Sequence, residues 1–124
     1  MQIILSDNMD ITRVGLMHVC DSTPDVTYRQ AADKTELIEQ LKSNGDAVVI
    51  LDYTLFDIND IDELEILHDS FPLARWILFS FELSQDFVRR AIAMSPLFSV
   101  LIKDSPLSEI RDCLRYAARN QRFI

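Results

Sequence analysis

The chain has few cysteines, few histidines and no long apolar run, and each of these absences excludes a class of protein. Cys20 and Cys113 are far apart in apolar helical stretches, which is typical of buried thiols in a reducing cytoplasm. His18 and His68 are isolated, so the spacing of a zinc site is not met. No apolar run approaches the length of a membrane span, and Met1 is not followed by the basic start of a signal peptide. We therefore expect a soluble cytoplasmic protein that does not enter a membrane.

Basic residues are also scarce relative to acidic ones. Twelve Lys and Arg face twenty Asp and Glu, which gives a net charge of −8. A nucleic-acid backbone is bound through Lys and Arg, so the charge argues against direct nucleic-acid binding by this domain. The 124 residues contain no repeat and no Pro/Gly/Ser-rich linker, which indicates one domain over residues 1–124. A chain of this length buries roughly two thirds of its unfolded surface, so it needs no disulfide or structural metal.

Strand and helix patterns alternate along the whole chain. Strands are predicted at 2–6, 26–31, 47–51, 76–79 and 98–102. Helices are predicted at 10–20, from 33 to a stop at Gly45, from about 61 to 68, at 84–94, and from 105 onward. This alternation predicts an α/β fold, with a doubly wound parallel sheet of five strands and helices on both faces. The most frequent order for such a sheet is 2-1-3-4-5.

Three of the predicted helices begin at capping signals. Asp10 is expected to cap the first helix, and Asp33 followed by Glu36 resembles a capping box. Ser105 and Pro106 are expected to be the N-cap and first residue of the last helix. The positions expected to face the core are Ile11, Val14, Met17 and Val19 in the first helix, and Leu107, Ile110 and Leu114 in the last.

Polar residues follow the strands at their carboxyl ends. They are Asp7 and Asn8 after the first strand, Asp52 after the third, Ser80 at the end of the fourth and Lys103 after the fifth. Alone, each is typical of a turn, a cap or a solvated side chain. Ligands of doubly wound sheets bind at this edge, where the winding reverses between the first and third strands. Together these residues therefore predict a functional site.

The chemistry that needs this set is phosphoryl transfer to a carboxylate. Two nearby carboxylates repel unless a cation lies between them, and Mg²⁺ suits one or two carboxylates with waters and a phosphate oxygen. Asp52 would be the nucleophile, and Mg²⁺ would neutralise charge on the phosphoryl oxygens. Lys103 would pair with the phosphoryl group, and the Ser80 hydroxyl would donate to one of its oxygens. That last bond forms only after phosphorylation, so it would pull the loop after Ser80 toward Asp52.

The segments IILSDN, AVVILDYT, ILFS and VLIKD, in this order, resemble the receiver domain of bacterial two-component response regulators over the whole chain. The resemblance implies a flavodoxin-like fold, Mg²⁺ as cofactor, and phosphorylation by a sensor histidine kinase or phosphotransfer protein. It implies that Asp52 is the phosphoacceptor and that Ser80 and Lys103 make the switch and phosphoryl contacts. The implied Mg²⁺ ligands are Asp7, Asn8, Asp52 and the backbone carbonyl of Thr54.

The pair Lys103-Asp104 is most similar to receivers that precede a helix-turn-helix domain of the LuxR/NarL kind. The resemblance therefore implies control of transcription through a DNA-binding domain after residue 124, with residues 115–122 leading into a linker. It implies a switch rather than an enzyme, with at most self-phosphorylation and self-dephosphorylation. The helix at 84–94, the strand at 98–102 and the last helix are the implied homodimer and output face. The kinase is expected to dock near the first helix and the loop after the fifth strand.

Four departures from the family pattern motivate a second interpretation. Asn8 replaces a carboxylate, which weakens Mg²⁺ binding, and Phe81 brings bulk next to Asp52. Val100 stands where an aromatic often reports the switch, and the loop after Asp52 lacks the usual Pro and Gly. The alternative is a degenerate receiver, which keeps the fold as a phosphorylation-independent protein-interaction module.

Two other readings have weaker support. A hydrolase with an aspartyl nucleophile needs D-x-D-x-T after the first strand, whereas the comparable segment from Asp52 to Thr54 follows the third and lacks the second Asp. A calcium loop would use Asp57, Asn59, Asp60 and Asp62. The EF-hand spacing requires an oxygen ligand where Ile61 stands and a glycine at the next position.

Overall fold

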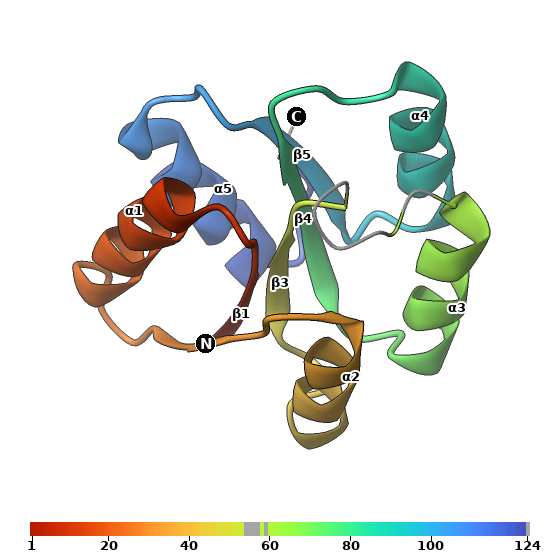
Figure 1. Cartoon of the computed structure of the whole chain (residues 1–124), viewed down its shortest axis with the longest axis horizontal. Coiled ribbons are helices and arrows are strands. Elements are labelled where there is room, and N and C mark those ends of the chain that lie inside the picture. The colour runs from red at the N-terminus through yellow and green to blue at the C-terminus, as the bar shows by residue number, and fades with distance from the viewer. Residues whose placement is uncertain (54–57, 59, 124) are drawn as a thin grey trace.

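The central element of the computed structural model is a parallel β-sheet (Figure 1). The structure describes residues 1–53, 58 and 60–123. Within this part of the chain the sheet has five strands in the order β2-β1-β3-β4-β5. The strands are β1 (Gln2–Ser6), β2 (Thr27–Gln30), β3 (Val48–Leu51), β4 (Arg75–Ser80) and β5 (Phe98–Ile102). The predicted fold class and strand order are confirmed, and the strand bounds differ from the predicted ones by one residue at most.

The register of the sheet places the carboxyl ends of the strands at one edge. Ser6 of β1 pairs with Leu51 of β3, and Ser80 of β4 pairs with Ile102 of β5. Every residue of β3 is buried, as expected for a central parallel strand covered on both faces. The residues that directly follow β1, β3 and β5 therefore meet at the same edge.

Helices cover both faces of the sheet. In Figure 1, α1 (Asp10–Asp21) and α5 (Leu107–Ala118) lie on one side. On the other side lie α2 (Lys34–Ser43), α3 (Ile61–Ser70) and α4 (Gln85–Met94). Neighbouring strand residues point to opposite faces, so Ile4 joins the core under α2, α3 and α4, whereas Ile3 and Leu5 join the core under α1 and α5.

The predicted cap and core face of α1 are partly wrong. The N-cap is Met9, and Asp10 is instead the first residue of the helix, where its charge still favours the helix dipole. Ile11 and Val14, expected in the core, are 80% and 66% exposed. The buried residues of the helix are Leu16, Val19 and Cys20. Because α1 has apolar residues on two sides, the rotation that it adopts is decided by its packing on the sheet.

The start of α5 also differs from the prediction. The N-cap is Pro106, with extended backbone, so the helix begins at Leu107, one residue later than expected. Leu107 is exposed, whereas Ile110 and Leu114 are buried as predicted. The exposed Leu107 and Ile11 leave apolar surface at the end of the sheet where the polar residues gather.

The capping box of α2 is confirmed with one variation. The Asp33 carboxylate accepts from the Glu36 amide at 2.8 Å. The Glu36 carboxylate accepts from the amide of Ala32, at 2.7 Å, rather than from the amide of Asp33. The reciprocal pair still satisfies two amides near the helix start.

Residues that follow α5 pack against β5 and the end of α4. The Phe123 carbonyl accepts from the Val100 amide at 3.1 Å. The Arg122 guanidinium donates to the carbonyls of Ile92 and Ser95, at 2.8 and 2.7 Å. The segment predicted to lead into a linker is therefore held against β5 and α4 as far as residue 123.

Both cysteines are buried and free, as predicted. Burial raises the pKa of the Cys113 thiol to about 12 from an ordinary value of 9.0, against a smaller lowering by the Ser99 hydroxyl. Burial, followed by the charge of Asp21, raises the pKa of Cys20 to about 11. Above pH 9.0 the unfolded chain loses these protons and the folded chain keeps them.

Stability is therefore expected to fall as the pH rises from 9.0 toward 12, by roughly 1.4 kcal/mol per pH unit for Cys113. Urea unfolding of the parent and Cys113→Ala on both sides of pH 9.0 measures this slope. The variant is expected to show a smaller slope. Equal slopes in the two proteins would contradict the prediction.

Candidate functional site

Three charged side chains meet at the carboxyl edge of the sheet. The Lys103 ammonium lies 2.9 Å from Asp7 Oδ2 and 2.7 Å from Asp52 Oδ2. The three side chains are 1%, 0% and 4% exposed respectively. Lys103 follows β5, so its side chain reaches past the end of β4 to the carboxylates that follow β1 and β3. The structure thus brings together the predicted nucleophile, one predicted metal ligand and the predicted phosphoryl-binding lysine.

The charges of this trio do not cancel. Two carboxylates and one ammonium leave one formal negative charge in a place that water barely reaches. Within the described residues, neither Lys103 Nζ nor Asp7 Oδ2 has a hydrogen bond of good geometry, although the two atoms are within ion-pair distance. A buried charge with incomplete hydrogen bonding is costly, so this site favours additional positive charge.

Backbone hydrogen bonds fix the position of each charged residue. The Asp7 carboxylate accepts from the Met9 amide at 2.8 Å, which turns the chain into α1. The Asp52 amide donates to the Ser6 carbonyl, and the Lys103 amide donates to the Ser80 carbonyl. The strand ends therefore hold the site in place before any ligand binds.

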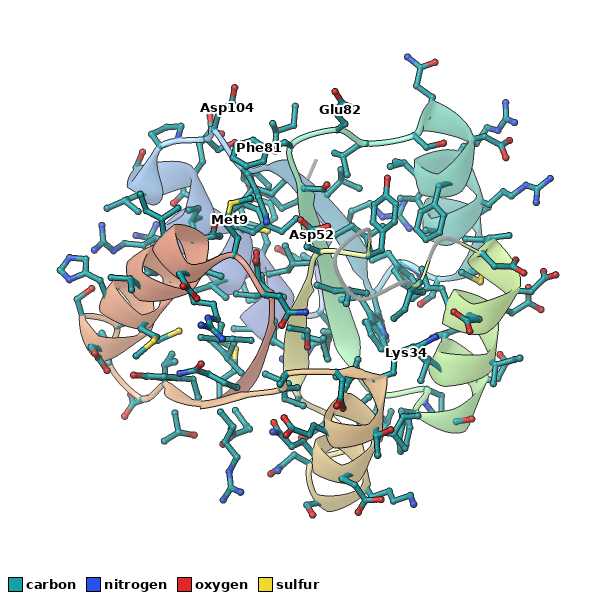
Figure 2. All side chains as sticks on the ribbon, in the orientation of Figure 1. Met9, Lys34, Asp52, Phe81, Glu82 and Asp104 are labelled. Carbon is teal, nitrogen blue, oxygen red and sulfur yellow. The ribbon has the colours of Figure 1, made fainter. Side chains whose placement is uncertain are left out.

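Two aromatic rings flank the ammonium. The Lys103 nitrogen lies 5.9 Å from the centre of the Phe79 ring and 5.6 Å from that of Phe81. Phe79 is buried, whereas Phe81 is 55% exposed. Figure 2 shows Phe81 at the same end of the molecule as Asp52. The bulky ring of Phe81 therefore lies over the Lys103 ammonium, at a distance at which a cation is attracted to an aromatic face.

The other residues that the sequence assigned to the site, or to a calcium loop, lie in different places. Ser80 is buried at the end of β4, and Asn8 is exposed at the rim. Thr54 lies outside the described residues, and so do Asp57 and Asn59, two of the residues of the hypothetical calcium loop. Asp60, in that same loop, accepts from the Asp62 amide and caps α3.

Solved structures share this architecture. The signal receiver domain of the response regulator NarL from Mycobacterium tuberculosis matches with a TM-score of 0.78 and 21% identity, over 95% of each chain. The chain has the receiver fold. The RcsB response regulator of Salmonella typhimurium matches with a TM-score of 0.85 and 19% identity, over all of this chain and 64% of RcsB. A LuxR family DNA-binding response regulator from Silicibacter pomeroyi matches with 0.80 and 15%, over 99% and 95% of the two chains.

The similarity to known proteins is found in the structure and not in the sequence. No family model matches the sequence, and no curated protein is similar to it. In the described part of the chain, no helix is long and apolar enough to cross a membrane. The receiver fold is therefore shown by the strand order and by the similarity to solved structures.

The donor atoms at the carboxyl edge of this receiver fold suit Mg²⁺. Among the described residues no three His, Cys, Asp or Glu lie together, so the acidic donors are the two carboxylates of Asp7 and Asp52. Mg²⁺ binds through one or two carboxylates and keeps several waters, whereas Ca²⁺ takes six to eight oxygen ligands. The buried Asp7 Oδ2 atom and the formal negative charge of the trio are consistent with a small divalent cation.

Apolar side chains surround the site on the α1 and α5 side. Ile11, Phe81 and Leu107 line a hollow of about 230 Å³ that also includes Lys103. All three apolar side chains are exposed. The charged site therefore opens beside an apolar surface, which we call the α1–α5 rim and define by Ile11, Phe81 and Leu107.

The residue that directly follows Asp52 makes contacts that the sequence did not reveal, with the connection between β4 and α4 rather than with the charged trio. Tyr53, directly after Asp52, is buried, and its hydroxyl lies 3.0 Å from the Ser84 amide and 3.4 Å from the Glu82 carbonyl. The signal in the sequence was a tyrosine at the end of an otherwise apolar run, but its partners lie 29 and 31 residues away.

Proposed function

We propose that this chain is a receiver domain of a two-component response regulator, which takes a phosphoryl group on Asp52 and acts as a switch. The observation that carries the proposal is the buried trio of Asp7, Asp52 and Lys103 at the carboxyl edge of a receiver fold. The trio has two carboxylates and one ammonium, so it keeps a formal negative charge that a divalent cation would balance.

The proposed reaction moves one phosphoryl group from a donor to Asp52. An oxygen of the carboxylate attacks phosphorus and forms a P–O bond, while the P–N bond of a donor phosphohistidine breaks. The electron pair of that bond stays on the imidazole, which takes up a proton from solvent. In the reverse half of the cycle, water attacks phosphorus, the P–O bond to Asp52 breaks, and inorganic phosphate leaves.

Asp7 and Asp52 would hold Mg²⁺, with Asn8 at the rim and the Thr54 carbonyl as the predicted further donors. When bound, Mg²⁺ neutralises the negative charge that develops on the phosphoryl oxygens. Asn8 supplies only an amide oxygen, so the site has one negative charge fewer than a site with three carboxylates.

Lys103 and Ser80 supply the contacts that turn phosphorylation into a conformational change. The Lys103 ammonium neutralises Asp52 in the free protein and is placed to pair with the phosphoryl group after transfer. The Ser80 hydroxyl, at the start of the connection between β4 and α4, would donate to a phosphoryl oxygen and draw that connection toward Asp52.

The α1–α5 rim provides a surface for the partner that delivers the phosphoryl group. Exposed apolar side chains that gather in one patch are typical of a contact with another protein. A sensor histidine kinase or phosphotransfer protein that covered the rim would bring its phosphohistidine to Asp52. The switch would then act on the face formed by α4, β5 and α5, through homodimerisation or through a DNA-binding domain after residue 124.

The test is to incubate the protein with Mg²⁺ and a small acyl phosphate donor and to measure its intact mass. The parent is expected to gain one phosphoryl group, and Asp52→Asn is expected to gain none. Asp46→Asn, at an exposed acidic residue before β3, is the matched control and should behave like the parent. Beryllofluoride, an analogue of the phosphoryl group, detects a site whose phosphate is too short-lived for the mass measurement.

A second function, binding without phosphorylation, is favoured by one observation. Lys103 already pairs with both carboxylates, and the residue at the rim is Asn8 rather than an acid. In that case neither the acyl phosphate nor beryllofluoride would alter the parent. An adduct that also formed on Asp52→Asn would contradict both functions at this site.

A further inference from the structure

Tyr53 joins the phosphoacceptor strand to the beginning of α4. Its hydroxyl accepts from the Ser84 amide at 3.0 Å and donates to the Glu82 carbonyl at 3.4 Å. Ser84 is the N-cap of α4, and its own hydroxyl accepts from the Phe87 amide. The Tyr53 hydroxyl therefore holds the residue that starts the helix.

The ring of Tyr53 makes a second contact with the same helix. It stacks on Phe87, with ring centres 4.1 Å apart and planes 8° from parallel. Phe87 is one of the two buried residues among the described residues of α4. The stacked ring and the hydroxyl thus fix both the position and the direction of the first turn of α4.

The side chains of the neighbouring residues Asp52 and Tyr53 make their contacts on opposite faces of the sheet. Asp52 pairs with Lys103, which lies against Phe79 in the core under α1 and α5. Tyr53 belongs to the core under α2, α3 and α4. Adjacent residues at the end of one strand therefore connect the charged site to the helix on the far side.

The connection between β4 and α4, residues 81–84, runs from Ser80 to the residue that the Tyr53 hydroxyl holds. Ser80, at its start, is the predicted partner of the phosphoryl group, and Tyr53 binds its last residue, Ser84. If Ser80 moves toward Asp52, the connection must shift against the hydrogen bonds of Tyr53. The proposed bond of Ser80 to the phosphoryl group and the bond of Tyr53 to Ser84 therefore pull residues 81–84 in different directions.

We infer that Tyr53 is a positioning residue that couples the state of Asp52 to the position of α4. Its hydroxyl holds the connection between β4 and α4 in the arrangement of the unphosphorylated protein. Phosphorylation releases this hold, and the ring then transmits the shift of the connection to Phe87. This inference rests on the proposed function and assigns its regulation to a residue that follows β3 rather than to one of β5.

The test is amide hydrogen exchange of residues 81–91, with and without Mg²⁺ and beryllofluoride, in the parent, Tyr53→Phe and Tyr116→Phe. Tyr53→Phe removes the hydroxyl and keeps the ring that stacks on Phe87. One hydrogen bond of ordinary strength corresponds to a two- to tenfold change in local opening. We therefore expect two- to tenfold faster exchange over residues 81–91 in free Tyr53→Phe, and at most half of the parent's response to beryllofluoride.

Tyr116→Phe makes the same chemical change on α5 and is expected to match the parent. The mass measurement on Asp52 should show the same extent of phosphorylation in all three proteins, because the hydroxyl does not touch the reacting atoms. Parent-like exchange and a parent-like beryllofluoride response in Tyr53→Phe would overturn the coupling while leaving the proposed function intact. A parent that does not respond to beryllofluoride would overturn both.

Discussion

Replacing Lys103 with methionine is expected to lower the free energy of unfolding by about 3–5 kcal/mol in Mg²⁺-free buffer, the cost of breaking a buried ion pair by removing one partner. The Lys103 ammonium is the cation within 2.9 Å of both Asp7 and Asp52, and all three side chains are buried. Methionine keeps the apolar length of the side chain between Phe79 and Phe81. It leaves two carboxylates facing each other without the charge that neutralises them.

Urea unfolding with a chelator in the buffer measures this loss. Lys42→Met makes the same substitution at an exposed lysine of α2 and is expected to change stability by no more than about 0.5 kcal/mol. Adding Asp52→Asn to Lys103→Met removes one of the two opposed charges, so the double variant should recover at least half of the loss. A Lys103→Met variant as stable as Lys42→Met would show that the trio carries no net buried charge.

Replacing Asn8 with aspartate is expected to tighten Mg²⁺ binding roughly tenfold or more, which corresponds to about 1.4 kcal/mol. Asn8 is exposed at the rim of the site, so the new carboxylate can form without being buried. Each added negative charge a few ångströms from a divalent cation is strongly favourable, even with solvent screening. The same substitution should raise the yield of phosphorylated Asp52 at low Mg²⁺ concentration.

Titration calorimetry with MgCl₂ gives the dissociation constants. Asn120→Asp adds the same charge at an exposed position after α5 and is the matched control. It should leave Mg²⁺ affinity at the parent value. Equal affinities in the parent and Asn8→Asp would mean that Asn8 does not face the cation and that the predicted ligand set is incorrect at this residue.

The fold and most of the site could be predicted because their signals are local. An uninterrupted apolar run such as Val48–Leu51 is typical of a central parallel strand, and its end at Asp52 marks the edge of the sheet. Once the order of the strands is known, Asp7, Asp52 and Lys103 must lie near one another. Phosphorylation and Mg²⁺ binding at these residues stay predictions.

Helix faces were predicted less well because apolar periodicity does not give the rotation of a helix. Ile11 and Val14 fit an apolar side of α1 as well as Leu16 and Val19 do. Only one side of α1 can pack against the sheet, and α5 covers part of the same face of the sheet. Both residues are exposed, and Ile11 is part of the α1–α5 rim, although periodicity alone assigned it to the core.

The sequence by itself determined the alternation of strands and helices and the polar residues that follow the strands, because these follow from backbone periodicity. The order of the strands was expected only as the most frequent one for this alternation, and the structure has that order. Only the tertiary structure decided that Lys103 reaches both carboxylates, that Tyr53 holds the start of α4, and that Arg122 binds the carbonyls at its end. Each of these contacts joins residues 27 to 96 positions apart, between Arg122 and Ser95 and between Lys103 and Asp7. Such contacts depend on the distance and direction between packed elements, which no local pattern in the chain records.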